Sequence, residues 1–450
     1  MVAAVDWATL EQTLRDAVVR AARAWADEHP TEQLGVVALA YLYRETDGPI
    51  YLPTLALVGA DTFAALPVHL RWSAADWEDF DVAWVPEDQA AAWQRALTAY
   101  ACSGSIEHWE STFDQFIELL VRVCRQARAE LSARGIPCLV VLLDEDDQFQ
   151  ESMVRRILTP AEVARYFPWY EERAAELARV AALPAAEQAA YYVSRLDGPP
   201  GVVDSERAEA MLRGLGRAAV EALLPLLAVD GRAWEAARLL ADIGRPDDDV
   251  VAGLTDALDR RQGSDREWAA RALSRLGRLD IVLNRVDRLP SSVVVTAVAA
   301  PYESVRDHSV APPRLDYTPL TEVIERWPEL EPALREALKP GTPFCRISRE
   351  EVDEALAGLD SPHRVVRRHA VAILDDRDLG EDVGARVLPR LAQAIRSDPD
   401  PVVRRLAVLS LTWWRQEARP YLDAVRAALD DPDDSVRDTA ERALLGDDIA

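Results

Sequence analysis

The spacing of apolar positions changes along the first 200 residues and predicts a mixture of helices and strands. Residues 6–28 have helical spacing. Two β-like runs, residues 34–43 and 50–58, flank a Thr46-Asp47-Gly48 turn and predict an antiparallel hairpin. The other expected elements are helices at 87–101 and 106–133, a short apolar strand at 138–143, and a helix opened by a capping box at Thr159 and Glu162. These patterns predict an α+β domain over residues 1–196, ended by Asp197-Gly-Pro-Pro-Gly201.

A repeated pattern fills residues 203–450. Arg367, Arg404 and Arg437 are each followed by Ala three positions later and by Leu four positions after that, and a proline precedes each at the same offset. A small residue lets neighbouring helices approach closely, and leucine one turn later fills the layer between them. A single helical pair cannot bury both its faces, so the pairs must stack. The repeat predicts an all-α solenoid, with an irregular stretch near residues 300–345, where prolines accumulate around one helix near 318–338.

Composition narrows the choice of partner. The chain has 450 residues and a formal net charge of −26, which repels phosphate backbones and anionic lipids but attracts a basic protein. No apolar run approaches the ~20 residues of a membrane span. The four cysteines are scattered, and residues 1–10 carry no basic segment. We therefore expect a cytoplasmic protein with a protein partner, no nucleic acid and no membrane.

Tryptophans supply candidate interface residues. Trp72 and Trp77 stand among the acidic residues Asp76 and Asp79, a combination that suits a partner rich in Arg or Lys. The alternative, which we favour, is that these tryptophans form the core of the N-terminal domain, because tryptophan is highly buried on average. Trp413 and Trp414 end a repeat helix, and adjacent helical residues point about 100° apart. One of this pair should therefore pack inside, and the other is an interface candidate.

Candidate chemistry is sparse. Asp144, Glu145 and Asp146 follow the apolar strand at 138–143, where carboxylates can hold a divalent cation. We favour a solvated acidic turn, because the four adjacent carboxylates of residues 144–147 cannot all converge on one ion. Cys102 lies near His108, yet no further orienting residue accompanies them. We predict no catalytic residue, no metal site and no cofactor. The alternative hypothesis is an N-terminal hydrolase or nucleotide-handling enzyme with the repeats as its targeting arm, which requires these side chains to converge in one pocket.

The D-x-P-x-x-V-R-x-x-A-x-x-x-L pattern at 397–411, and its partners at 360–374 and 430–444, resembles the HEAT-like repeats of phycobilin lyases. In that family, Asp and Arg form a polar ladder between stacked units. The resemblance implies structural ladder positions at Arg266, Arg367, Arg404 and Arg437, and Ala233 breaks the ladder in an earlier unit. HEAT-like hydroxylases carry His-Glu dyads, but none of the six histidines here is followed by Glu. The acidic charge argues against the DNA glycosylases of this repeat family.

The stretch Arg71-Trp-Ser-Ala-Ala-Asp-Trp77 resembles a bacterial domain of unknown function, family 4303. That resemblance implies no established activity, although small bacterial domains of this type often accompany toxin–immunity systems. Together, these features favour a non-enzymatic protein-binding scaffold, serving as an immunity or regulatory protein for a basic partner.

Overall fold

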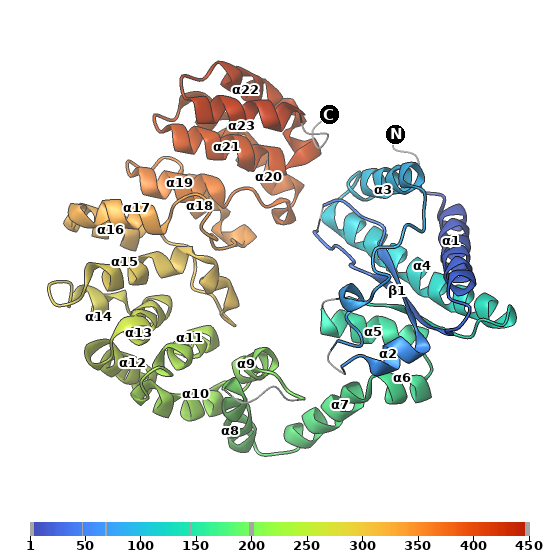
Figure 1. Cartoon of the computed structure of the whole chain (residues 1–450). Coiled ribbons are helices and arrows are strands. Elements are labelled where there is room, and N and C mark those ends of the chain that lie inside the picture. Colours follow the sequence, from blue (N-terminus) through green and yellow to red (C-terminus); the bar gives the residue numbers. More distant parts are fainter. Residues whose placement is uncertain (1–3, 47, 68–69, 145, 198–201, 446–450) are drawn as a thin grey trace. The chain divides into compact units, whose positions relative to one another are not determined.

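The computed structural model describes residues 4–46, 48–67, 70–144, 146–197 and 202–445. The chain divides into two compact units, Met1–Ala175 and Glu176–Ala450 (Figure 1). The first unit combines helices with a small sheet, and the second is a helical HEAT-like solenoid. The predicted fold class, an α+β N-terminal domain followed by an all-α solenoid, is confirmed.

The N-terminal unit is built around a three-stranded sheet with the order β2-β1-β3. β1 (Leu34–Ala40) pairs antiparallel with β2 (Thr54–Gly59) and parallel with β3 (Leu139–Leu142), so the predicted hairpin and the third strand are present. β1 ends three residues earlier than the apolar run, because Tyr41 adopts a left-handed backbone with φ of 58°. The sheet is almost wholly buried, and α1 (Trp7–Glu28) and α4 (Ile106–Ala133) pack against it.

Shorter helices complete this unit, and the Thr159–Glu162 capping box forms as predicted, with both of its hydrogen bonds. They are α2 (Ala60–Ala65), η1 (Ala74–Asp76), α3 (Glu87–Ala101), α5 (Asp147–Ile157), α6 (Pro160–Tyr166) and α7 (Pro168–Ala181), the last of which extends into the second unit.

The second unit begins earlier than the residue 203 at which the repeat pattern predicts it to begin. α8 (Ala185–Leu196) packs against α9 (Ser205–Gly214) and α10 (Arg217–Leu223). Ala189, Tyr192 and Leu196 share a buried cluster with the helices that follow them. The helix pattern before residue 196 looks the same whether it packs on a sheet or on a solenoid, so spacing alone does not place this boundary.

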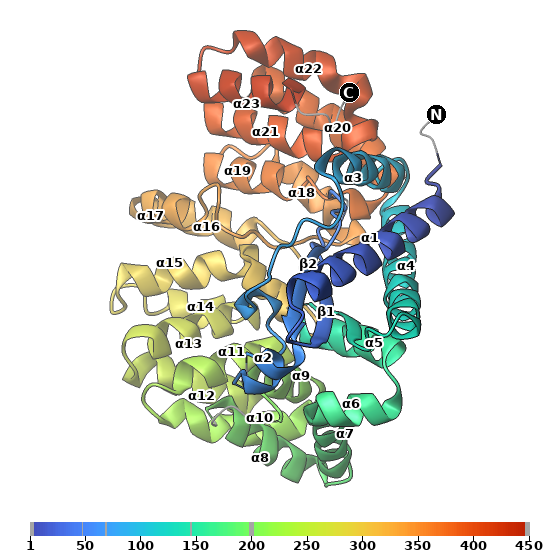
Figure 2. The ribbon, with the colours of Figure 1, turned by 45° about the vertical axis from the view of Figure 1, so that its right-hand side comes forward.

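Helices of the second unit stack in sequence order, in two layers (Figure 2). In one layer α11, α13 and α15 pack in succession, as do α19, α21 and α23; in the other, α20 packs against α22. The bounds are η2 (Leu224–Ala228), α11 (Ala233–Ile243), α12 (Asp248–Arg260), α13 (Gly263–Arg275), α14 (Leu279–Leu283), α15 (Ser291–Ala299), α18 (Val352–Gly358), α19 (Arg364–Ala372), η7 (Arg377–Leu379), α20 (Glu381–Ser397), α21 (Pro401–Trp413), η8 (Arg415–Tyr421), α22 (Leu422–Ala427), η9 (Ala428–Asp430) and α23 (Asp434–Leu445).

The proline-rich stretch near 300–345 is irregular, as the sequence predicts, but its helix is divided in two. Two helices, α16 (Thr318–Arg326) and α17 (Glu331–Ala337), stand where one is expected, separated by the 3-10 turn η5 (Pro328–Leu330). Proline cannot donate a backbone hydrogen bond inside a helix, so Pro328 interrupts the run. The other turns are η3 (Ala300–Tyr302), η4 (Ser304–His308) and η6 (Arg349–Glu351).

A buried polar network joins this stretch to the repeat that follows. Arg306 pairs with Glu351, and both side chains are almost fully buried. His369, on α19, is completely buried, and its Nε2 donates to the carbonyl oxygen of Tyr302 at 2.9 Å. Because that carbonyl can only accept, Nδ1 is left to accept from the Tyr317 hydroxyl at 2.7 Å. Burial lowers the pKa of His369 to about 4, so the ring is neutral at neutral pH.

Candidate partner-binding surfaces

The tryptophans of the N-terminal unit mostly serve its core. Trp77 is 3% exposed and donates from Nε1 to the carbonyl oxygen of Arg71, so its prediction as a partner contact is wrong. Trp72 is half-buried; its ring stacks on Phe167 with centroids 4.2 Å apart, and Nε1 donates to the Tyr166 carbonyl oxygen. The core alternative therefore accounts for Trp77 and for much of Trp72.

The two aspartates of this cluster differ in their accessibility. Asp79 is half-buried and accepts a hydrogen bond from Nε1 of Trp25 at 2.6 Å, and its backbone carbonyl oxygen accepts from the amide of Leu57 in β2. Asp76 is exposed. Asp79 therefore has a structural partner, whereas Asp76 stays a predicted contact residue.

The Trp413–Trp414 pair divides as the helical geometry predicts. Trp414 is 1% exposed and donates from Nε1 to the Leu374 carbonyl oxygen at 2.8 Å, so it is a packing residue and its prediction as a partner contact is wrong. Trp413 is 51% exposed, and Leu409, one turn earlier on α21, is also exposed. These two side chains leave an apolar strip on α21 open to a partner.

Two of the four predicted ladder arginines join neighbouring repeats. Arg404 binds Asp431 with two parallel hydrogen bonds of 2.7 and 2.8 Å, and Arg367 binds Asp398 at 2.9 Å. Arg437 instead pairs with Asp434 of its own helix and donates to the Asp431 carbonyl oxygen. The Arg367–Asp398 and Arg404–Asp431 pairs fix how consecutive repeats are aligned, because a two-point arginine–carboxylate contact is geometrically specific.

The fourth position, Arg266, pairs with no carboxylate in the part of the chain that the structure describes, so the ladder predicted there is not formed. One repeat earlier, where Ala233 replaces arginine, Asp265 accepts hydrogen bonds from the backbone amides of Gly231 and Trp234. At Ala233, where the ladder arginine is absent as predicted, the Asp265 carboxylate therefore joins the two repeats by binding backbone amides instead.

Further inter-repeat pairs escaped the sequence analysis. Arg368 binds Asp400 beside the predicted ladder, at 2.7 and 3.0 Å. Asp242, almost fully buried, accepts from Arg275 at 2.7 Å and from Arg213 at 3.0 Å. The separations of 29 residues from Arg213 to Asp242 and 33 residues from Asp242 to Arg275, close to the repeat length, were the signal that could have revealed the second set.

The largest exposed aromatic cluster was not predicted. Tyr41, Tyr43 and Tyr51 are each nearly half exposed, which is unusual for side chains of this size. The rings of Tyr43 and Tyr51 contact each other edge-on, with centroids 5.6 Å apart, and the ring of Tyr41 packs against that of Phe80, with centroids 5.4 Å apart. We call these four residues the tyrosine patch. The apolar runs that predicted the hairpin include Tyr41, Tyr43 and Tyr51, but the strands end before Tyr41 and begin after Tyr51, so the three side chains are not tied into the sheet.

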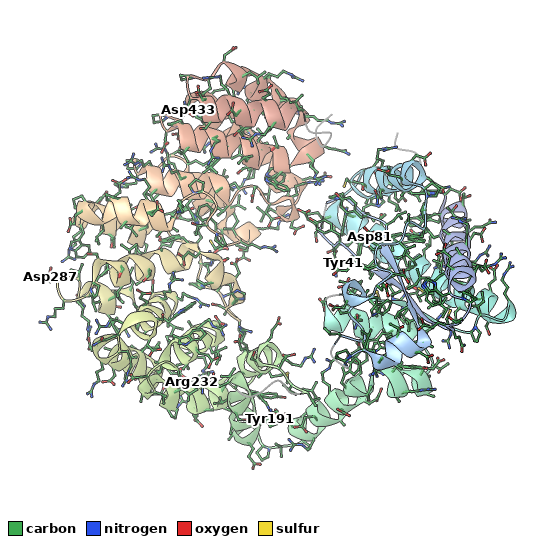
Figure 3. All side chains as sticks on the ribbon, viewed as in Figure 1. Tyr41, Asp81, Tyr191, Arg232, Asp287 and Asp433 are labelled. Atoms are coloured by element: carbon green, nitrogen blue, oxygen red, sulfur yellow. The ribbon has the colours of Figure 1, made fainter. Side chains whose placement is uncertain are left out.

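Carboxylates border the tyrosine patch. Glu45 accepts a hydrogen bond from the Tyr43 hydroxyl at 2.6 Å, and this contact raises the pKa of Tyr43. Asp81 is exposed and directly follows Phe80, whose ring packs against Tyr41 (Figure 3). Tyr41 and Asp81 both have positive φ values, 58° and 56°, a backbone state that non-glycine residues seldom adopt. Such strained residues concentrate at functional positions.

The side chains that the enzymatic alternative needs make separate contacts: Cys102 and His108 bond to different backbone carbonyls, and the Asp144 carboxylate accepts from the Asp146 amide. Cys102 donates to the Gly48 carbonyl oxygen at 3.8 Å, and the His108 ring bonds to the Tyr100 carbonyl oxygen at 3.0 Å. Asp144 is half-buried after β3, Asp146 is exposed, and Glu145 lies outside the described residues. The described residues hold no group of three or more His, Cys, Asp and Glu side chains that could bind a metal ion.

The N-terminal unit has a pocket of 680 Å³, but it lies at the end of the strands opposite to Asp144. It opens beside the first residues of the parallel strands, at Leu34 and Leu139, and the ion pair of Arg128 with Glu162 lines it. In sheets with parallel strands, ligands usually bind at the carboxyl ends of the strands. Cys138 in its wall is buried enough to raise its pKa to about 12, so the thiol is not a nucleophile at neutral pH. The pocket therefore does not supply the convergence that the enzymatic alternative requires.

No helix in the described part of the chain is both long and apolar enough to cross a membrane. No curated protein matches the chain. Solved structures similar to it include human deoxyhypusine hydroxylase in complex with glycerol, at 23% identity over 58% of this chain and 96% of that one, with a TM-score of 0.24. Kap121p matches at 13% identity over 85% of this chain with a TM-score of 0.23, and Kap121p bound to the SUMO protease Ulp1p matches at 12% identity over 85% with a TM-score of 0.22.

The chain spans only 34% of Kap121p, and TM-scores this low give no evidence about function. The finer resemblances, to phycobilin lyases and to domain family 4303, stay predictions. Residues 352–445, by contrast, match the family model for HEAT repeats, and they are the residues in which the Arg–Asp ladder forms. HEAT repeats are therefore identified over residues 352–445.

Proposed function

We propose that this chain is a non-enzymatic protein-binding scaffold, which holds a basic protein partner on the tyrosine patch of its N-terminal unit. The observation that carries the proposal is the grouping of three half-exposed tyrosines with Glu45 and Asp81. Tyrosine offers a large contact area at a small entropy cost, because only two side-chain angles must be fixed. Aromatic faces and carboxylates together attract arginine and lysine side chains.

Two features of the whole chain support a basic partner. The net charge of −26 accelerates the approach of a positively charged protein at low salt. HEAT repeats stack into extended surfaces suited to protein binding, and the exposed strip of Leu409 and Trp413 offers a second contact within the matched repeats. In this proposal the chain acts as an immunity protein that neutralises a basic toxin, or as a regulator of a basic cellular protein.

A capture experiment with matched variants tests the proposal. The tagged full chain is incubated with native lysate at low salt, and bound proteins are identified and quantified by mass spectrometry. We expect one stoichiometric partner with a net positive charge. The double substitution Tyr43→Ala and Tyr51→Ala should weaken its binding by about tenfold or more, since buried aromatic contacts dominate interface energies.

Controls separate the patch from general stickiness. Leu445→Ala removes an equally apolar side chain that is 76% exposed, and it should leave capture unchanged. Trp413→Ala reports on the α21 strip and should reduce capture less than the double substitution does. Recovery of no stoichiometric protein, or of a partner that the double variant binds as tightly, contradicts the proposal.

A further inference from the structure

One rung of the Arg–Asp ladder has its charge reversed. Arg266 is the fourth residue of α13, as Arg404 is of α21 and Arg437 is of α23. The aspartate that Arg404 binds, Asp431, lies three residues before the next helix of the same layer, α23. After α13, the next helix of that layer is α15, which begins at Ser291, and three residues before it stands Arg288. An arginine therefore occupies the position of the ladder carboxylate.

Arg266 and Arg288 both line the same pocket, which has a volume of 470 Å³. Arg266, Arg288 and Arg285 line it together with Asn284. Among the described lining residues, the one carboxylate is Asp259, and Arg285 binds both of its oxygens, at 2.8 and 3.1 Å. The carboxylate in the pocket is thus already engaged, while two further positive charges face the same space.

Neither Arg266 nor Arg288 pairs with a carboxylate among the residues that the structure describes. Nε of Arg266 is buried without a hydrogen-bond acceptor in the part of the chain that the structure describes. Arg288 is exposed, and its neighbour Asp287 does not line the pocket but projects from the α14–α15 loop (Figure 3). A buried donor without an acceptor costs about 1–3 kcal/mol, and two like charges in one pocket repel. An anion would relieve both effects.

We propose that this pocket binds one carboxylate side chain from a protein partner, which takes the place of the missing ladder aspartate. A carboxylate fits better than other oxyanions, because the intact rungs show that an arginine at this helical position binds a planar carboxylate at two points. The inference deepens the proposed scaffold function and rests on it. A single acidic side chain seated here would set the register of a partner that is otherwise basic.

The test measures ligand-induced stabilisation of the full chain by thermal unfolding. The probe is N-acetyl-aspartate amide, which carries one side-chain carboxylate, compared with inorganic phosphate and with sodium chloride at matched ionic strength. At about ten times its dissociation constant, the probe should raise the wild-type midpoint by about 2 °C. Arg288→Asp restores the ladder carboxylate, so it should raise the midpoint by about 2 °C without ligand and abolish the response to the probe.

Two further variants complete the design. Arg288→Ala should lose most of the response without restoring the rung, and it keeps the test informative if the aspartate variant folds poorly. Arg426→Ala removes an exposed arginine that does not line the pocket, and it should respond as the wild type does. An unchanged response in Arg288→Asp, or stabilisation by phosphate alone, overturns the inference. These measurements use the purified chain without its partner. They can therefore be interpreted even if the capture experiment on the tyrosine patch fails.

Discussion

In the HEAT repeats over residues 352–445, Arg–Asp ion pairs recur at the same position from one repeat to the next. Between residues 300 and 351, the ion pairs do not follow a repeated pattern. Arg367–Asp398 and Arg404–Asp431 join successive repeats at the same helical position, with side chains that keep some exposure to water. The irregular stretch relies on Arg306–Glu351, which is almost fully buried. In the repeats, the free energy of folding is therefore shared among many similar contacts. In the irregular stretch, it depends more on a few almost fully buried contacts.

The deepest contact should therefore show the largest effect. Arg306→Ala leaves the Glu351 carboxylate buried without its cation, and we expect a loss of about 4 kcal/mol in the free energy of unfolding. Urea denaturation of the full chain, followed by tryptophan fluorescence, measures it. The matched control is Arg314→Ala, whose pair with the neighbouring Glu350 is 76% exposed on both sides and should contribute less than about 0.5 kcal/mol. Equal losses in the two variants would refute the contrast between the regions.

Protonation of His369 gives the next largest effect, at the junction of the two regions. Burial lowers its pKa from an ordinary 6.5 to about 4. Between these values the unfolded chain binds a proton that the folded chain does not, so stability falls as pH drops from 6.5 to 4. The full shift corresponds to a loss of about 3 kcal/mol. Burial also raises the pKa of Asp375, to about 6, which opposes this trend at acid pH.

Comparison with His369→Gln isolates the histidine, because Asp375 titrates in both proteins. The glutamine side chain of this variant keeps polar atoms near Tyr302 and Tyr317 but cannot bind a proton in this range. The stability difference between the two proteins should therefore shrink as the pH falls from 6.5 to 4, in denaturation curves taken at intervals across that window. Parallel pH profiles would show that folding does not shift the pKa of His369, which contradicts the prediction.

What the sequence predicts also differs between the two regions. Periodic Ala and Leu positions revealed the stacked repeats, and the resemblance to HEAT-like repeats implied ladder roles for Arg367 and Arg404, which both pair with an aspartate. The Arg306–Glu351 pair spans 45 residues without any repeat, so no local pattern joins its two members. The same reasoning explains why one helix was predicted around residues 318–338: apolar spacing continues past Pro328, although its ring stops the hydrogen-bond ladder.

The candidate sites show the same limit. Helical geometry correctly required one of Trp413 and Trp414 to be buried, but it could not say which. The burial of Trp77 follows from contacts with distant residues, which the acidic sequence around it conceals. The tyrosine patch depends on where the strands stop, and element ends are the least predictable feature of a sequence. Charge reversal at Arg288 became visible only when the helix starts were known.

A single rung of the repeated ladder should have the smallest of these effects. Arg404→Ala removes two hydrogen bonds to Asp431, and because both side chains keep a little contact with water, we expect a loss of about 2 kcal/mol by urea denaturation. Arg396→Ala breaks an exposed inter-repeat pair with Asp423 and should cost about 0.5 kcal/mol or less. If Arg404→Ala were as costly as Arg306→Ala, the repeats would depend on single contacts as the irregular stretch does. If it were as mild as Arg396→Ala, apolar stacking alone would hold the repeats together, and the ladder would only set their register.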